Sequence, residues 1–290
     1  MKRCKRVTRA LLCALALSVF VSPAFAQSTA IEPCPATPAP GIPSKPKIET
    51  RAGLLQVDAS VPDDPDVLTM LAPYSAKVRE LSKVIGRLEG GLNRTGAGSG
   101  PLGNFIADGM RWQAQQKLGK PVALAIMNSG GIRKGEIAAG DLRASDIFEL
   151  LPFENALVAV DVTGVQLTAL LKIVTSRDAQ AGAHIEFRYD DRDRRELRRA
   201  KLIDETGQQV EIDPNKVYTI VTLDYLLRLQ SGAYAILQEA KNTTTLNVTL
   251  RDAVMNYVKS ETAAGRPIRA VTDNRFVQIG PGPRNPEPPR

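Results

Sequence analysis

Apolar residues recur at two different periods along this chain, and the change of period from segment to segment predicts its elements. A spacing of three to four residues predicts helices over 66–88, 102–118, 146–150, 164–174 and 250–261. Short apolar or alternating runs predict strands over 121–127, 155–162, 184–189, 199–205, 210–212 and 217–224. Helices and strands interleave without a regular repeat. The pattern therefore predicts an α+β (mixed α/β) fold, with mixed sheets flanked by helices.

Several of the predicted boundaries carry start or turn signals of their own. Asp64 and Pro65 form a typical helix start, and Thr163 followed by Gly164 predicts a capped helix. Thr206-Gly207 predicts a turn between two strands. The densest run of charge, 190–199, is interpreted as the solvated tip of a hairpin.

The ends of the chain differ from its centre. Residues 1–26 combine a basic start, an apolar run over 11–21 and a closing Ala24-Phe25-Ala26, which is typical of a secretory signal peptide cleaved after Ala26. The apolar run is shorter than the roughly 20 residues that a membrane span needs. The sequence thus predicts a periplasmic or secreted protein without a membrane span.

The remaining chain divides by composition into three parts. Residues 27–50 are rich in proline and are predicted to form an extended linker, 51–280 a folded domain, and 281–290 a disordered tail. A domain of this length can bury one substantial core. Cys34 is the only cysteine after the signal peptide, so no internal disulfide is expected.

Charge also depends on the signal peptide. Its removal takes away five Lys and Arg and no Asp or Glu, which lowers the net charge from +7 to +2. The high isoelectric point of the whole chain therefore overstates how basic the exported protein is. A general nucleic-acid-binding surface is not expected.

The first candidate for ligand chemistry is the segment 128–133, which follows a predicted buried strand. Gly130 and Gly131 allow the main chain to approach a ligand closely, and Arg133 offers a planar set of donors that suits phosphate. Ligand sites concentrate at strand ends in α/β folds. The alternatives are an ordinary turn for the glycines and a plain surface charge for Arg133, which spacing alone slightly favours.

A second candidate lies about twenty residues later, in 152–155. Phe153 follows a proline and offers a flat face for stacking a base, or it packs under the loop as a core residue, with equal weight on both interpretations. His184 is the single histidine and is interpreted as structural. One histidine does not make a two-metal phosphoesterase centre, which needs a cluster of ligands.

Five sequence blocks, in collinear order between about residues 60 and 280, carry a family resemblance. The blocks are 101–104 with Asp108, 128–133, 152–155, 223–226 and 273–276. Together they resemble the C-terminal domain of bacterial and animal 5′-nucleotidases, a group that includes UDP-sugar hydrolases and cyclic-nucleotide phosphodiesterases. The resemblance implies the fold of that domain.

The resemblance also implies a division of labour. In the family, an N-terminal metallophosphoesterase domain holds two metals and hydrolyses the substrate, while the C-terminal domain supplies the nucleoside pocket and part of the phosphate clamp. It implies a substrate-binding set without a catalytic residue, metal ligand or cofactor in this chain. That set is Asn128 and Arg133 for phosphate, Phe153 and Tyr225 for stacking, Asn155 near the base edge, and Gly130 and Gly131.

Two departures from the family separate three hypotheses. Ser231 stands where the family has a ribose-binding aspartate, and no metallophosphoesterase domain precedes the match; Arg94 is the nearest candidate for an upstream basic residue. The chain is interpreted as the substrate-binding half of a nucleotidase that works with a separately encoded, metal-bearing metallophosphoesterase. The alternatives are a stand-alone nucleoside- or nucleotide-binding protein and a folded relic kept for interaction.

Overall fold

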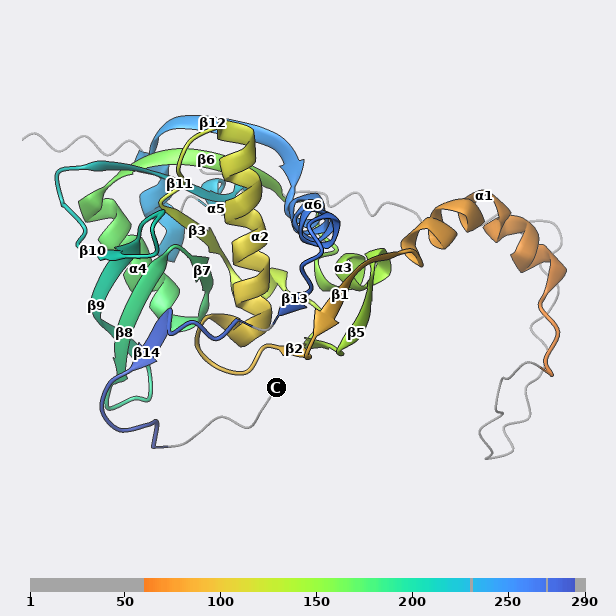
Figure 1. Ribbon diagram of the computed structural model, residues 1–290, viewed down its shortest axis with the longest axis horizontal. Helices are drawn as coiled ribbons and strands as arrows, with labels where there is room; N and C mark the ends of the chain where they lie inside the picture. Colours follow the sequence, from red (N-terminus) through yellow and green to blue (C-terminus); the bar gives the residue numbers. More distant parts are fainter. Residues whose placement is uncertain (1–59, 230–231, 270, 285–290) are drawn as a thin grey trace, which may run out of the picture. The chain divides into compact units, whose positions relative to one another are not determined.

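The computed structural model describes residues 60–284, except 230–231 and 270. The expected signal peptide, linker, Cys34 and Ser231 lie outside the described residues, as does most of the expected tail. All the elements discussed below belong to one structural unit that begins at Pro62 (Figure 1).

A mixed five-stranded sheet, ordered β12-β6-β11-β3-β7, forms the centre of the fold. Its strands are β3 (Leu124–Met127), β6 (Ala156–Thr163), β7 (Ala179–Ala181), β11 (Val217–Leu223) and β12 (Lys241–Thr249). β3 and β11 are parallel, and the other neighbours pair antiparallel. All four residues of β3 are buried. Such a continuous apolar run is typical of a strand covered on both faces.

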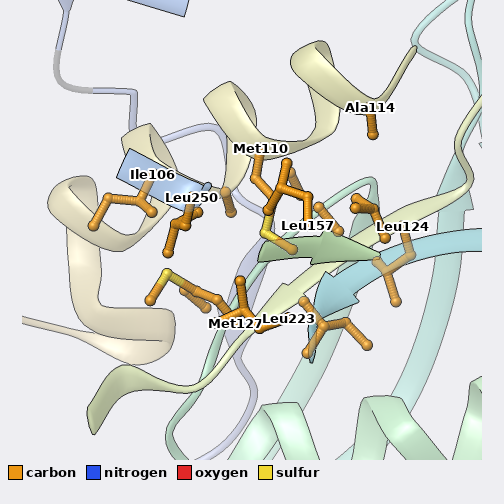
Figure 2. Packing of buried hydrophobic residues seen from close by; sticks show 14 of the residues in the cluster. Ile106, Met110, Ala114, Leu124, Met127, Leu157, Leu223 and Leu250 are labelled. Atoms are coloured by element: carbon orange, nitrogen blue, oxygen red, sulfur yellow. The ribbon is translucent and has the colours of Figure 1, made fainter. Parts of the chain in front are cut away.

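The main core lies between this sheet and two helices, α2 (Gly100–Leu118) and α6 (Leu250–Ala263). Figure 2 shows Ile106, Met110 and Ala114 of α2 directed toward side chains from three strands. Those strand residues are Leu124, Met127, Leu157 and Leu223, and Leu250 of α6 joins them. Each large side chain that is fully buried in this way contributes about 1.5–3 kcal/mol.

A second sheet is ordered β10-β9-β8-β14. Its strands are β8 (Ala183–Tyr189), β9 (Arg195–Ile203), β10 (Gln209–Val210) and β14 (Phe276–Gln278). The predicted hairpin tip is confirmed but shorter, because β9 already begins at Arg195. Asp190 closes the tip by accepting hydrogen bonds from the backbone N–H of Arg192 and Arg194 (2.8 and 2.9 Å). These bonds, with the Arg194 side chain, lower the pKa of Asp190 to about 2.

Two small sheets complete the strand set. They are ordered β13-β1-β5 and β2-β4, and consist of β1 (Val84–Glu89), β2 (Leu92–Asn93), β4 (Glu136–Ile137), β5 (Gly140–Arg143) and β13 (Ile268–Arg269). The prediction of one helix over 66–88 is wrong in its second part, since the helix ends at Leu81 and β1 follows. β-branched Val84 and Ile85 with Gly86 disfavour a helix. Gly86 also packs so tightly that a Cβ there would lie 2.6 Å from Val258 Cγ1 of α6.

Four further helices and three 3₁₀ turns complete the fold of the described residues. The helices are α1 (Pro65–Leu81), α3 (Ala144–Leu150), α4 (Gly164–Arg177) and α5 (Asp224–Leu227), and the turns are η1 (Ala97–Ser99), η2 (Ser129–Gly131) and η3 (Ala233–Glu239). Of these helices, α3 and α4 agree closely with the predictions, whereas α5 was not predicted. Asp64 caps α1 by accepting from the N–H of Asp66 and Val67. Thr163 and Gln166 form a capping box on α4. Within the described part of the chain, no helix is long and apolar enough to cross a membrane.

Candidate functional site

Strand register brings the ends of several strands to one edge of the five-stranded sheet. β3 and β11 run side by side in the same direction, with Ile220 level with Leu124, so both end at this edge. β6 and β7 run the opposite way and therefore begin there, as the pairs Leu223–Leu157 and Met127–Ala179 show. We call this the site edge; it carries 128–133, 153–155, Asp178, Asp224 and Tyr225.

The segment 128–133 leaves β3 as a single 3₁₀ turn. Gly131 N–H donates to the Asn128 carbonyl (3.1 Å) and Arg133 N–H donates to the Leu150 carbonyl (2.9 Å). A Cβ on Gly130 would lie 3.5 Å from Asn128 Nδ2, which is an ordinary contact. The turn itself does not require glycine at 130, so the close approach of a ligand to this backbone stays a prediction.

Two residues that were not predicted as part of the site hold this turn in place. Arg94 donates from Nη1 to the Ile132 carbonyl and from Nη2 to the Ser129 carbonyl, both at 3.0 Å. On the other side, Ser129 N–H donates to Asp178 Oδ1 (2.8 Å). Arg94, considered above only as an upstream basic residue, therefore stabilises the 128–133 turn through these two hydrogen bonds.

Asp178 links the turn to η3. Its Oδ2 accepts a hydrogen bond from the Tyr234 hydroxyl (2.7 Å), and both side chains are buried. Burial raises the pKa of Tyr234, and the charge and hydrogen bond of Asp178 raise it further, so the phenol stays a donor. Asp178 follows α4 directly and has no sequence motif of its own, which is why the sequence did not reveal it.

Phe153 and Arg133 come together at the site edge. The Arg133 guanidinium carbon lies 5.8 Å from the centre of the Phe153 ring, a cation–π contact worth about 0.5–1 kcal/mol when exposed. The Phe153 side chain is 45% exposed. Of the two interpretations of Phe153, the core residue is wrong, because nearly half of this residue is exposed.

Asp224 joins the loop that carries Asn155 to the start of α5, which carries Tyr225. Its Oδ1 accepts from the N–H of Ala156 (3.0 Å) and of Tyr225 (2.8 Å). The Asn155 carbonyl accepts from Leu250 N–H (2.8 Å), which ties the same loop to the start of α6. Tyr225 lies in α5 rather than at the end of the strand, and its side chain is 44% exposed.

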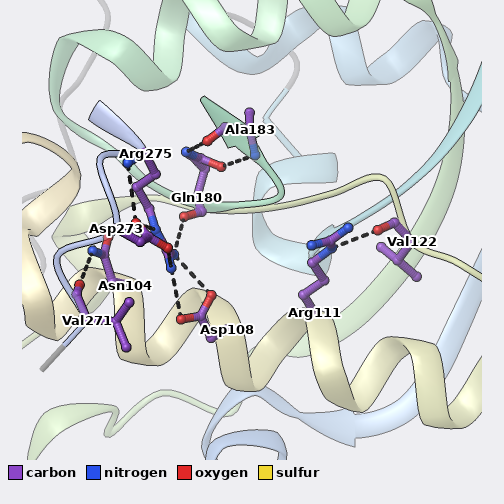
Figure 3. A network of polar contacts seen from close by, with 9 residues as sticks. All are labelled: Asn104, Asp108, Arg111, Val122, Gln180, Ala183, Val271, Asp273 and Arg275. Carbon is purple, nitrogen blue, oxygen red and sulfur yellow. Dashed lines mark hydrogen bonds and ion pairs between the residues drawn. The ribbon is translucent and has the colours of Figure 1, made fainter. Parts of the chain in front are cut away.

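Other blocks that carry the family resemblance form a separate, interior cluster, shown in Figure 3. Arg275 donates from Nη1 and Nη2 to the two carboxylate oxygens of Asp108, both at 3.0 Å, and to Asp273 Oδ2 at 2.6 Å. It also donates to the Gln180 carbonyl (3.1 Å). Burial lowers the pKa of Arg275, but its bonds to Asp273 and Asp108 outweigh burial and raise it. We call Asp108, Asp273 and Arg275 the arginine clasp.

The arginine clasp fastens the end of the chain to α2. Asn104 adds to it by donating from Nδ2 to the Val271 carbonyl (2.7 Å). The blocks 101–104 and 273–276 thus meet in space. Their role in this structure is to hold the fold together.

His184 and the acidic residues do not assemble a metal centre in the described residues. His184 Nδ1 lies 2.9 Å from the Asn274 carbonyl oxygen, and Nε2 lies 3.6 Å from Glu186 Oε1, which suits a structural role. In residues 60–284 without the gaps given above, no group of three or more His, Cys, Asp or Glu side chains is placed to hold a metal ion. The assignment of metals to another chain stays a prediction.

Comparison with known proteins agrees with this geometry. A family model described as "5'-nucleotidase, C-terminal domain" matches residues 84–239. A trifunctional nucleotide phosphoesterase protein, YfkN, of Bacillus subtilis is 31% identical over 149 residues, which cover 49% of this chain and 10% of that protein. A 5′-nucleotidase of Vibrio vulnificus is 28% identical over 148 residues, covering 49% of this chain and 26% of its own length.

Solved structures extend the match to the fold. The 5′-nucleotidase precursor from Thermus thermophilus has a TM-score of 0.61 at 24% identity, covering 77% of this chain and 45% of that one. The NAD nucleotidase of Haemophilus influenzae has a TM-score of 0.55 at 19% identity, covering 75% and 42%. This chain thus spans under a third of those two curated relatives and under half of these structures. The family match covers more than half of the chain, which belongs to the 5′-nucleotidase C-terminal domain family.

Proposed function

We propose that this protein binds a nucleoside or nucleotide at the site edge, as part of nucleotide catabolism. The observation that carries the proposal is the register of β3, β6 and β11, which gathers Asn128, Asn155 and Tyr225 at one edge. Phe153 and Tyr225 are each nearly half exposed there. Exposed aromatic rings beside an arginine are the elements from which sites for a base and a phosphate are built.

Each residue has a distinct task in this proposal. Phe153 and Tyr225 stack on the base, and Arg133 binds phosphate. The Arg133 guanidinium carbon lies 5.8 Å from the Phe153 ring centre, and a guanidinium carries five N–H donors that suit phosphate. Asn128 Oδ1 is buried and has no hydrogen-bond partner within the described residues. Because this oxygen is enclosed, the Nδ2 group, which can donate to phosphate, is the part of Asn128 that we assign to the ligand.

The expected affinity is modest. Stacking contributes about 1–3 kcal/mol per base contact, and a charge-assisted arginine contact about 1.5–3 kcal/mol. Association opposes this through lost translational and rotational freedom, which leaves a Kd in the range of about micromolar to millimolar.

Hydrolysis is assigned in this proposal to a second protein. The partner is a separately encoded, exported metallophosphoesterase that brings the divalent metals, and this chain presents the substrate to it in the periplasm or outside the cell. Support comes from the family match, which is to a C-terminal domain, and from two longer relatives, of which the matched residues cover only 10% and 26%. The basic and apolar start of the sequence supports export.

Calorimetric titration with AMP and with adenosine tests the binding step. We expect measurable heat with both ligands and tighter binding of AMP, because only AMP engages Arg133. Phe153→Ala should lose this heat, whereas Val165→Ala, which truncates a 64% exposed side chain on α4, should not. Absence of heat up to millimolar ligand would contradict the proposal for the protein alone.

Phosphate release tests the partner step separately. Copurified or mixed metallophosphoesterase should release phosphate from AMP in a metal-dependent way only when both proteins are present. Binding without any gain on mixing would support the stand-alone nucleotide-binding protein instead. Release by the rigorously purified single chain, abolished by a chelator, would overturn the assignment of the metals to a second protein.

A further inference from the structure

Helix α1 has no buried face. None of its 17 residues is buried among the described residues. Its large apolar side chains stand in solvent, with exposed fractions from 45% to 65%. They are Val67, Leu68, Met70, Leu71, Tyr74 and Val78. Each of the other α-helices of at least seven residues in the described part of the chain has buried residues.

Such a helix needs a packing partner. Isolated helices of about 12–15 residues are marginal in water, and helices in proteins are stabilised mainly by packing of an apolar face. Pro73 lies in the interior of α1, where it removes one backbone hydrogen bond. The Asp64 cap and the first-turn Asp66 favour the helix start, but they do not cover its apolar face.

The spacing of the apolar residues indicates what kind of partner fits. One stripe of α1 repeats with alternating steps of four and three residues: Val67, Leu71, Tyr74, Val78 and Leu81. We call these residues the α1 stripe. This step pattern is the heptad repeat by which two helices pack side by side. The partner surface is therefore another helix rather than a sheet or a loop.

The charges at the two ends of α1 indicate which helix packs against it and in which direction that helix runs. The start of α1 is acidic, with Asp63, Asp64 and Asp66, whereas Lys77, Arg79 and Lys83 make its end predominantly basic. Glu80 is the exception, and it pairs with Lys83 at 2.5 Å. A second α1 laid antiparallel brings the acidic start of each helix beside the basic end of the other. A parallel copy would set like charges together at both ends.

We propose that two copies of this chain associate through their α1 stripes, packed antiparallel. The pair is centred between Leu71 and Tyr74, so that Val67 of one copy packs level with Val78 of the second. The end of α1 borders a cleft lined by apolar Leu81, Val84 and Ile85, which continues the apolar surface beyond the helix.

The association is expected to be weak. A helix of 17 residues is about 25 Å long. The face it offers is smaller than the interfaces of about 1,200–2,000 Å² that form stable complexes. The dimer should therefore depend on concentration, and the exposed charges make it sensitive to salt.

Sedimentation velocity of the purified protein, from micromolar to near-millimolar concentration, tests the proposal. We expect a reversible monomer–dimer equilibrium. Leu71→Asp should weaken it at least about tenfold, which corresponds to about 1.4 kcal/mol. Thr69→Asp places the same charge on the opposite face of α1 and should leave dimerisation unchanged. Because both positions are exposed, both variants should keep the wild-type circular dichroism and unfolding midpoint.

Charge exchange tests the antiparallel direction. One variant carries Asp63→Lys with Asp66→Lys, and the other Lys77→Glu with Arg79→Glu. Each alone should be monomeric, and an equimolar mixture should form a heterodimer. Direction is tested by the variant with all four changes, which reverses both ends: it should dimerise with itself but not with wild type, and pairing with wild type instead would contradict the antiparallel arrangement. Added salt should weaken the wild-type dimer; strengthening by salt would contradict the antiparallel arrangement. A wild-type monomer at all concentrations would overturn the proposal and leave the α1 stripe to a helix of another protein.

Discussion

The site edge and the arginine clasp are built from sequence blocks that resemble the same family, yet they differ in almost every physical respect. At the site edge, Phe153 and Tyr225 are nearly half exposed. In the arginine clasp, Arg275 is 6% exposed and surrounded by two carboxylates and a carbonyl. A resemblance by itself does not separate ligand-binding residues from residues that hold a fold together. Exposure and hydrogen-bond saturation do.

The two regions also differ in what their arginine N–H groups contact. The hydrogen bonds of the Arg275 guanidinium go to protein acceptors, which locks α2 to the end of the chain. Arg133 instead is exposed and lies over an aromatic ring, and its N–H donors are assigned to a ligand in the proposed function. Substitution by alanine is therefore expected to lower stability at Arg275 and ligand affinity at Arg133.

The largest effect is expected from Arg275→Ala. It leaves Asp108 and Asp273 without their cation. Breaking a fully buried pair costs about 3–5 kcal/mol, and because these two carboxylate side chains are 29% and 36% exposed, we expect a loss at or below the lower end of that range. Urea denaturation followed by circular dichroism measures the loss. Arg284→Ala, which removes an exposed ion pair with Asp191, is the control and should cost under about 1 kcal/mol. Equal losses in both variants would show that the arginine clasp is not a special source of stability.

A smaller effect on stability, combined with an effect on binding, is expected from Asp178→Ala. The variant leaves the Ser129 N–H and the buried Tyr234 hydroxyl without an acceptor, which should cost about 1–3 kcal/mol. Because Asp178 also positions the 128–133 turn, AMP binding by the folded variant should weaken. Tyr234→Phe retains the bond to Ser129, so it should lose stability with little change in affinity. Identical affinity losses in the two variants would argue against a positioning role for Asp178.

The smallest effect on stability is expected at the site edge itself. Arg133→Ala and Tyr225→Ala change exposed side chains, so unfolding free energies should stay within about 0.5 kcal/mol of wild type. Their affinity for AMP should fall roughly 5- to 150-fold, the equivalent of about 1–3 kcal/mol. Titration calorimetry beside urea denaturation separates the two quantities. A destabilised Arg133→Ala protein with unchanged affinity would move Arg133 into the class of Arg275.

The sequence predicted the elements that are apolar and periodic. The helix α2, the buried strand β3 and the capped helix α4 agree closely with their apolar spacing and start signals. No element was predicted for 241–249, although β12 pairs with β6 there. That strand is mostly polar and exposed, and Asn242 and Asn247 adopt positive φ within it, so it lacks the alternation of an ordinary strand.

The site residues that were predicted are those that lie within a recognisable sequence motif. Asn128, Phe153 and Tyr225 were accessible to prediction through their motifs, and the structure places them at one edge. Arg94 and Asp178, which brace the turn, depend on hydrogen bonds between segments 35 and 49 residues apart in sequence. Such partners are fixed by tertiary packing, which local patterns do not encode. The binding roles themselves stay predictions until a ligand is measured.

The most direct test of the central contrast measures two quantities on two variants. AMP affinity and the free energy of unfolding are determined for Phe153→Ala and Arg275→Ala beside wild type. We expect the two variants to differ in opposite ways. Phe153→Ala should keep the stability of wild type and lose affinity for AMP. Arg275→Ala should lose stability and, at temperatures where it remains folded, keep its affinity for AMP. If neither variant loses affinity for AMP, or if Phe153→Ala loses stability, the division between a ligand-binding site edge and the arginine clasp is contradicted.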